Sequence, residues 1–257
     1  MSRYICVDIG GTSIKHGVLD ENAIIEESNQ TKTEAWLGGA EVLDKVKAIG
    51  KQYMEQYENI EGICISTAGM VDPEEGKIVF AGELMPDYTG TCIKKELEKT
   101  LGIPCEVEND VNCAGLAEYI SGAAKESHIM FCATVGTGIG GCAIVDGSVF
   151  HGASNSACEI GYIPMEDSDF QTLGASSILI KKVAGKKREP LDMWDGKKIF
   201  ELAEKGDEVC ISAIKEMCDV LGKGLATICY VLNPDTIVLG GGVMAQKKIL
   251  ENEIIDS

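Results

Sequence analysis

Two glycine-rich turns, far apart in the chain, constrain most strongly how this sequence can fold. The first lies in residues 7–15, where an apolar run ends in Asp8, Gly10 and Gly11 and a second apolar run follows at once. The second lies in residues 131–147 and repeats the order of apolar strand, glycine turn, apolar strand and acidic turn. Each pattern predicts a β-hairpin. Two such hairpins in one chain indicate a duplicated unit.

The tips of these hairpins suit phosphate binding. Glycine has no side chain, so each tip can present backbone N–H groups to phosphate oxygens. Asp8, at the end of the first strand, can hold Mg²⁺, because this ion prefers oxygen ligands. An ordinary tight turn would explain either hairpin alone, whereas the repetition favours a nucleotide clamp.

A dinucleotide-binding motif is the alternative for the second turn. Gly136, Gly138 and Gly141 satisfy the pattern G-x-G-x-x-G, but that motif requires a helix to begin at the glycines. Residues 142–145 are apolar and β-branched in part, and an acidic glycine turn follows them. The order is strand, turn, strand, which argues against a dinucleotide fold.

Composition limits the partners and the compartment. The formal net charge of −18 argues against nucleic acid and anionic membranes. No apolar run approaches the ~20 residues of a membrane span, and no signal peptide is recognisable. None of the 11 cysteines form a C-x-x-C pair, so we expect a reducing, cytoplasmic setting without disulfides. Most cysteines should be small buried side chains, among them Cys6, Cys64, Cys132, Cys142 and Cys229.

Predicted strands and helices alternate along the chain, which indicates an α/β architecture. Strands are expected at residues 23–26, 62–66, 105–108 and 236–239, and helices at 40–57, 93–101, 111–120 and over most of 175–232. We expect two domains, at residues 1–115 and 116–257.

Asp110 is the strongest candidate for a catalytic group. It lies between a predicted strand and a predicted helix, where the free N–H groups of the helix keep a carboxylate ionised. Transfer of a phosphoryl group to an alcohol needs such a base. A plain helix N-cap is an equally good explanation of this residue.

Two further segments could contact a ligand. Glu159 and Tyr162 follow a loop of small residues and could hydrogen-bond sugar hydroxyls, or lie on a solvated surface. Residues 240–242 are all glycine and let a flat ring or a phosphate approach the backbone, or they serve helix packing. The three histidines have no ligand-like spacing and should be packing or surface residues.

Four segments together resemble the ROK sugar kinases, a family of the actin-like ATPase superfamily. They are residues 8–12, 108–112, 136–141 and 232–243. The resemblance implies two actin-like (ribonuclease-H-like) α/β domains around an ATP and sugar cleft. It also implies a homodimer that transfers phosphate from ATP to a hexose, usually at the 6-hydroxyl, with Asp110 as the general base.

The resemblance also implies the binding residues. Mg²⁺ would be held at Asp8, next to the ATP phosphates. The expected ATP and phosphate contacts are Gly10, Gly11, Thr12, Lys15, Gly136, Thr137, Gly138, Gly241 and Gly242. The expected sugar contacts are Thr67, Ala68, Gly69, Asn109, Asp110, Glu159 and Tyr162.

The chain departs from the family pattern at several positions. Residues 173–178 contain no cysteine where many members carry a zinc motif, so no zinc is expected. Tyr162 replaces a common histidine, and residues 81–86 offer no clear match to the usual sugar-loop asparagine. Relatives continue through further helices, so the resemblance leaves two alternatives open, a truncated C-terminal domain or a tail that lies beyond the sequence given.

The exact sugar and the catalytic competence stay open at this stage. Residues 87–91 resemble a Gram-positive branch that includes N-acetylmannosamine and β-glucoside kinases, and glucose is a third candidate. The alternative function is a sugar-sensing regulator of the same family, or a non-catalytic module that binds sugar or ATP. Such regulators carry an N-terminal DNA-binding helix-turn-helix, whereas this chain enters its first strand by Tyr4.

Overall fold

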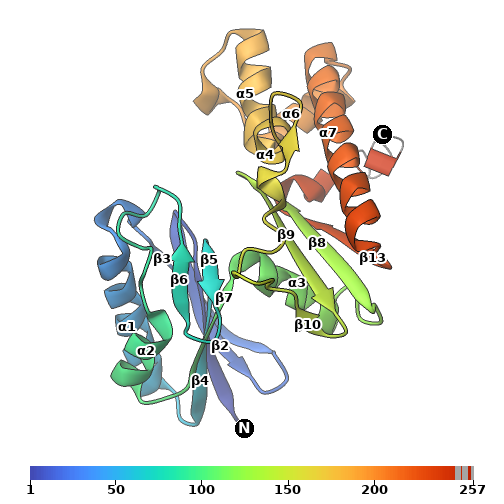
Figure 1. The fold of residues 1–257 in the computed structure, drawn as a ribbon. Helices are drawn as coiled ribbons and strands as arrows, with labels where there is room; N and C mark the ends of the chain where they lie inside the picture. The colour runs from blue at the N-terminus through green and yellow to red at the C-terminus, as the bar shows by residue number, and fades with distance from the viewer. Residues whose placement is uncertain (247–249, 251–253, 256–257) are drawn as a thin grey trace. The chain divides into compact units, whose positions relative to one another are not determined.

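A computed structural model describes residues 1–246, 250 and 254–255 of the chain. The chain divides into two compact units. Unit 1 comprises Met1–Cys113 with Ala153–Ser156, and unit 2 comprises Ala114–Gly152 with Ala157–Ser257. Each unit combines a β-sheet with helices (Figure 1). The α/β fold class expected from the sequence is therefore confirmed.

Unit 1 is built on a five-stranded sheet of order β3-β2-β1-β4-β7. The strands span Arg3–Ile9 (β1), Ser13–Asp20 (β2), Ile25–Lys32 (β3), Ile60–Thr67 (β4) and Cys105–Asn109 (β7). β1, β2 and β3 pair antiparallel, whereas β4 runs parallel to both β1 and β7. The first glycine turn joins β1 to β2, as the sequence predicts.

Two helices cover one face of this sheet, α1 (Gly39–Gln56) and α2 (Ile93–Leu101) (Figure 1). α1 buries Val42, Val46 and Tyr53, a helical stripe that packs with alternate side chains of β1 and β4. A 3₁₀ turn (η1, Ala35–Leu37) precedes α1, and a small antiparallel pair, β5 (Met70–Asp72) and β6 (Lys77–Phe80), follows β4. The apolar core of unit 1 therefore lies between the sheet and these helices.

Unit 2 repeats the core arrangement of unit 1. Its sheet has the order β10-β9-β8-β13, with β8 at Ile129–Val135, β9 at Ile139–Val145, β10 at Ser148–Val149 and β13 at Thr236–Gly240. β8 and β9 form a hairpin across the second glycine turn, and β13 runs parallel to β8. The same hairpin with a third, parallel strand occurs in unit 1 as β1, β2 and β4, which agrees with a duplicated unit.

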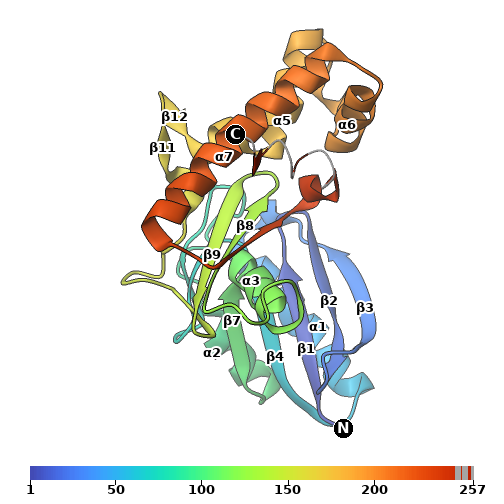
Figure 2. The same cartoon turned by 90° about the vertical axis from the view of Figure 1, so that its right-hand side faces the viewer.

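Helices make up most of the rest of unit 2. α3 (Asp110–Ser121) leads into the unit from β7, and α4 (Phe170–Gly174), α5 (Ser176–Lys187), α6 (Gly196–Glu204) and α7 (Glu208–Leu232) follow the hairpin. The long helix α7 leads into β13 (Figure 2). One side of α7 is buried through residues such as Met217 and Leu221, and it packs with α4, α5 and α6. Short elements complete the unit: η2 (Ile160–Tyr162), β11 (Pro164–Met165), β12 (Ser168–Asp169), η3 (Leu191–Met193) and η4 (Gly242–Gln246).

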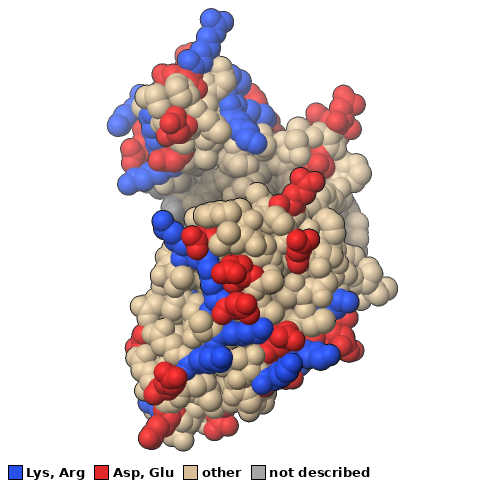
Figure 3. All heavy atoms as spheres, turned by 90° about the vertical axis from the view of Figure 1, so that its left-hand side faces the viewer, with Lys and Arg blue, Asp and Glu red and all other residues tan. Residues whose placement is uncertain are grey.

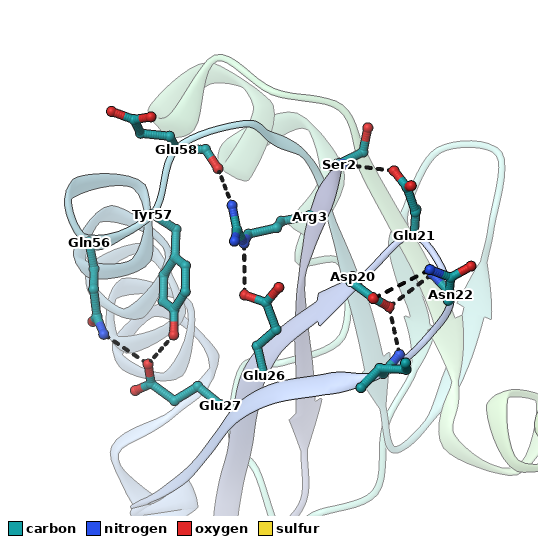
Figure 4. Close-up of polar contacts among 11 residues, drawn as sticks. Ser2, Arg3, Asp20, Glu21, Asn22, Glu26, Glu27, Gln56, Tyr57 and Glu58 are labelled. Carbon is teal, nitrogen blue, oxygen red and sulfur yellow. Dashed lines mark hydrogen bonds and ion pairs between the residues drawn. The ribbon is translucent and has the colours of Figure 1, made fainter.

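The third strand differs from the sequence prediction. It was expected at residues 23–26, but β3 spans Ile25–Lys32 and is almost entirely exposed. Apart from Ile25 its side chains are polar, so no hydrophobic alternation marks it. Arg3 forms an ion pair of 2.7 Å with Glu26, and the Tyr57 hydroxyl donates to Glu27 at 2.6 Å (Figure 4). These contacts tie the edge strand to β1 and to the end of α1.

Two of the cysteines also differ from the prediction. Cys64 and Cys229, expected to be buried, are exposed, and Cys6 is partly exposed. Cys132 and Cys142 are buried as expected. Strand and helix membership alone does not specify which face a side chain takes.

The helix-covered face of unit 1 mixes basic and acidic side chains (Figure 3). On it, Lys47 forms ion pairs with Asp44 of α1 at 3.2 Å and with Glu96 of α2 at 3.1 Å, and so links the two helices. Within the described residues, none of the helices is both long enough and apolar enough to span a membrane.

Candidate active site

The carboxyl ends of three parallel strands gather the candidate residues of unit 1. The register pairs Asp8 of β1 with Ser66 of β4, and Thr67 of β4 with Asn109 of β7. The first glycine turn, the loop after β4 and the start of α3 therefore follow directly from one edge of the sheet. In open α/β sheets ligands bind at this edge.

Asp8 has a carboxylate that is both oriented and accessible. The Ser66 hydroxyl donates a hydrogen bond of 2.9 Å to Asp8 Oδ1, and Lys15 Nζ lies 3.7 Å from Asp8 Oδ2. The Asp8 side chain is 42% exposed and that of Lys15 66%. Carboxylate oxygens of this kind fit a hard divalent cation, and the ammonium beside them fits a phosphate.

The first glycine turn is held by its own backbone. Gly10 N–H donates to the Ser13 carbonyl at 3.1 Å, and Thr33 N–H donates to the Thr12 carbonyl at 3.1 Å. A Cβ atom built on Gly11 would meet no protein atom within 4 Å. The fold therefore does not need a glycine at residue 11, and the open space there can admit a ligand close to the backbone.

Asn109 caps helix α3, a role that sequence analysis left open for Asp110. Its Oδ1 accepts from the backbone N–H groups of Val111 and Asn112, at 2.9 and 3.1 Å. Its Nδ2 donates to the Gly69 carbonyl at 2.9 Å and to Asp110 Oδ1 at 3.1 Å. Because the cap is provided by Asn109, the N-cap explanation of Asp110 is not needed.

Asp110 occupies the first position of α3 and remains exposed. The loss of hydration around its carboxyl raises the pKa of Asp110, and the negative charge of Asp8 raises it further. Hydrogen bonds from Val111 N–H, at 3.0 Å, and from the Asn109 amide act in the opposite direction on the pKa. A carboxylate with a raised pKa is a better proton acceptor, which suits a general base.

The loop after β4 separates into a buried anchor and an exposed part. Thr67 is fully buried, and its hydroxyl lies 2.8 Å from the Tyr88 hydroxyl, so its side chain does not face solvent. Ala68 is exposed and Gly69 partly so. Gly69 has φ of +102°, and a Cβ there would come within 2.7 Å of the Phe80 carbonyl oxygen. Glycine is therefore required at residue 69.

In unit 2, the second glycine turn meets the start of α5. The Gly136 carbonyl accepts from Ser176 N–H at 3.1 Å and from the Ser176 hydroxyl at 2.6 Å. The Ser177 hydroxyl donates to the Thr137 carbonyl at 2.7 Å. Gly136 has no protein atom within 4 Å of a built Cβ. The turn thus combines open backbone with the positive end of a helix, both favourable for phosphate.

The glycines after β13 lie at the same edge of the sheet. The register pairs Gly240 with Thr134 of β8. Gly241 has φ of +96°, and a Cβ there would clash with the Val135 carbonyl. Gly242 begins η4 and has open space around a built Cβ. The segment therefore lies directly against the end of β8, next to the second glycine turn.

Glu159 and Tyr162 frame the 3₁₀ turn η2. Tyr162 N–H donates to the Glu159 carbonyl at 3.2 Å, and residues three apart in a 3₁₀ turn lie on the same side. Glu159 is partly buried, whereas the Tyr162 side chain is 58% exposed. Both side chains can therefore serve one ligand.

Several supporting residues were missed by sequence reasoning. Ser66 orients Asp8, and Ser176 and Ser177 hold the second turn. Glu108 Oε1 accepts from Asn109 N–H and from the Asn112 amide. The sequence offered one signal for them, which is the position of Ser66 near a strand end and of Ser176 and Ser177 at a helix start.

Within the part of the chain that the structure describes, no three His, Cys, Asp or Glu side chains are grouped to hold a metal ion. A cation at Asp8 would therefore share its coordination with phosphate oxygens of a nucleotide and with water.

Comparison with known proteins identifies the family of the chain. A model of the ROK family matches residues 4–257. A β-glucoside kinase from Klebsiella pneumoniae is 31% identical over 257 residues, which cover 96% of this chain and 84% of the relative. The crystal structure of a ROK family glucokinase from Streptomyces griseus with glucose and AMPPNP superimposes with a TM-score of 0.83. It is 27% identical, covering 100% of this chain and 88% of that one. A ROK family protein from Streptococcus pneumoniae in complex with sucrose has a TM-score of 0.86 and 29% identity, over 99% and 86% of the two chains.

Proposed function

The chain belongs to the ROK family, and from this premise we propose that it is an ATP-dependent sugar kinase. It transfers the γ-phosphoryl group of ATP to a hydroxyl of a hexose or hexose derivative, at the 6-position. The relatives that are named as β-glucoside kinase and glucokinase support this activity.

The observation that carries the proposal is the environment of Asp110. Its carboxylate is exposed, its pKa is raised, and the Asn109 amide holds one of its oxygens in place at 3.1 Å. In the reaction Asp110 takes the proton of the sugar hydroxyl as that oxygen bonds to the γ-phosphorus. Such proton transfer contributes ~10²–10⁴-fold to the rate.

Each unit offers one glycine turn whose backbone suits the phosphate groups of ATP. In unit 1 the backbone of Gly10, Gly11 and Thr12 and the ammonium of Lys15 serve this role. In unit 2 it falls to Gly136, Thr137 and Gly138, while Gly241 and Gly242 lie against the adenosine part. Asp8 would hold Mg²⁺, which would supply positive charge beside the ATP phosphates. The two functional domains are residues 1–115 and 116–257.

The proposed sugar contacts are hydrogen-bonding groups. Ala68, Gly69 and Asn109 belong to unit 1, and Glu159 and Tyr162 to unit 2. Thr67, the remaining sugar contact proposed in this loop, is buried, and its hydroxyl lies 2.8 Å from the Tyr88 hydroxyl. Glucose, N-acetylmannosamine and a β-glucoside are the candidate acceptors. The homodimer implied by the family resemblance belongs to the same proposal, and light scattering of the purified chain tests it.

An ADP-release assay over a sugar panel tests the activity. The panel contains glucose, N-acetylmannosamine, cellobiose and fructose, with the chain at equal concentration in each reaction. Sugar-dependent ADP release supports the proposal and identifies the acceptor. Calorimetric binding of ATP or sugar without ADP release would instead assign a non-catalytic binding module.

A further inference from the structure

Two cysteines lie side by side in the sheet of unit 1. Cys6 of β1 and Cys64 of β4 are register partners on neighbouring parallel strands. Neighbouring strands are ~4.8 Å apart, and a disulfide requires Cα atoms ~4.4–6.8 Å apart. Paired residues of adjacent strands also point to the same face of the sheet. The two thiols can therefore join without a change in strand pairing.

Both thiols are on the face of the sheet opposite the core. Ile5 and Val7 of β1 and Ile63 and Ile65 of β4 are buried in the core, and the cysteines alternate with them. Cys64 is exposed and Cys6 partly exposed. A small reagent in water can thus reach Cys64 first.

The pair also favours reaction at Cys64. A hydrogen bond from the Cys6 thiol lowers the pKa of Cys64 below that of an ordinary thiol. The thiolate is the nucleophilic form of cysteine. The neighbouring Cys6 is in position to react with an oxidised Cys64.

We propose that Cys6 and Cys64 form a dithiol site that is oxidised by hydroperoxides to a reversible disulfide. The Cys64 sulfur attacks one peroxide oxygen and the O–O bond breaks, which gives Cys64 sulfenic acid and releases water or an alcohol. The Cys6 sulfur then attacks the Cys64 sulfur, and the displaced hydroxyl leaves with the Cys6 proton as water. The two thiols lose two electrons in total, and the peroxide gains them.

The site is coupled to the phosphate site through the same two strands. Two residues beyond the cysteines, the Ser66 hydroxyl donates to Asp8 Oδ1 at 2.9 Å. Because most disulfides hold their Cα atoms ~5.5–6 Å apart, a disulfide here adjusts the spacing of β1 and β4 next to this bond and so shifts Asp8 slightly, without changing the strand pairing. This consequence rests on the proposed kinase function. Oxidation should lower kinase activity about tenfold or more, because small misplacements of reacting groups cost up to ~10²-fold.

The disulfide itself is tested without any activity measurement. The reduced full chain is treated with hydrogen peroxide, its free thiols are alkylated after denaturation, and its peptides are mapped by mass spectrometry. We expect a Cys6–Cys64 linked peptide that disappears on treatment with dithiothreitol. Cys132 and Cys142 are the internal control, because they are also register partners but both are buried. They should remain unlinked.

Two variants separate the roles of the cysteines. In Cys6→Ser the oxidation should stop at a sulfenic acid on Cys64, which dimedone traps. In Cys64→Ser, Cys6 should stay reduced. Peroxide that modifies the exposed Cys229 without linking Cys6 to Cys64 would overturn the proposal, and so would a link from Cys64 to another cysteine.

The effect of the disulfide on the phosphate site is measured separately, as kinase activity. Kinase activity of the wild-type chain should fall on oxidation and return with dithiothreitol, whereas Cys64→Ser should keep its activity in peroxide. A linked peptide with unchanged activity would overturn the coupling alone. A chain without kinase activity in any condition would contradict the proposed function, while the linked peptide would still decide the dithiol site.

Discussion

The side-chain amide of Asn109 donates a hydrogen bond of 2.9 Å to the carbonyl oxygen of Gly69. This bond joins the start of α3, where Asp110 lies, to the exposed loop after β4. The other donor of the same amide reaches Asp110 Oδ1. The Asn109 side chain therefore positions both Asp110, the proposed base, and the loop proposed to bind the sugar.

Replacing Asn109 by aspartate should shift the pH dependence of the reaction. The carboxylate still caps α3, but it cannot donate to Gly69 and adds a negative charge beside Asp110. A like charge raises the pKa of Asp110 further, so Asp110 stays protonated to a higher pH. The acidic limb of the kcat/KM profile should therefore move to higher pH. Asn109→Ser keeps a capping oxygen and loses the amide hydrogen bond to Asp110 without adding a charge, so its limb should move in the same direction but by less. An equal limb in both variants would contradict this account.

Replacing Gly11 or Gly136 by alanine should weaken ATP binding without destabilising the fold. A Cβ on Gly11 or Gly136 meets no protein atom within 4 Å, so only a bound phosphate can collide with it. The KM for ATP should rise about tenfold or more, with the melting temperature at least as high as that of the wild type. Gly185→Ala, at an open position in the last turn of α5, is the matched control and should leave the KM unchanged. If the KM for ATP is unaltered in the Gly11 and Gly136 variants, the two glycine turns do not bind the phosphates of ATP.

Removing the carboxylate of Glu159 should impair sugar binding selectively. A carboxylate can accept from two adjacent sugar hydroxyls, and unpaired groups in a closed site cost roughly 1–3 kcal/mol each. Glu159→Ala should raise the KM for the sugar about tenfold or more and leave the KM for ATP nearly unchanged. Steady-state titrations of both substrates measure this. If neither constant moves, the sugar pocket lies elsewhere.

Kinase activity should depend on Mg²⁺ held at Asp8, and the chain should bind no zinc. Excess EDTA should abolish activity, and Asp8→Asn should need more Mg²⁺ for half-maximal activity, because the amide attracts a cation less strongly. Elemental analysis of the purified chain should find no stoichiometric zinc, since residues 173–178 lack cysteine. Full activity in EDTA, or one zinc ion per chain, would contradict the respective half of this prediction.

The sequence was sufficient for elements whose burial is periodic. Both glycine hairpins lie where they were predicted, because apolar strands flank glycine-rich turns. α7 was recognisable because one side of it is apolar over its length. β3 was misplaced because an exposed strand held by Glu26 and Glu27 has no apolar alternation.

Non-local contacts could not be predicted from the sequence. That Asn109 rather than Asp110 caps α3 depends on where β7 ends and on the Gly69 loop, which is distant in the chain. The exposure of Cys64 and its pairing with Cys6 depend on the register of two parallel strands. Such a register is set by the packing of the whole sheet and leaves no local signal.

The most direct measurement of the central claim is single-turnover phosphorylation by Asp110→Asn, with ATP binding measured by calorimetry on the same preparation. The amide preserves the shape of the side chain and its neighbours in α3, but it cannot take the proton of the sugar hydroxyl. We expect the rate of phosphoryl transfer to fall by ~10²–10⁴-fold while the affinity for ATP stays close to that of the wild type. A variant that binds ATP and keeps most of the wild-type rate would exclude Asp110 as the general base and contradict the mechanism proposed for this chain.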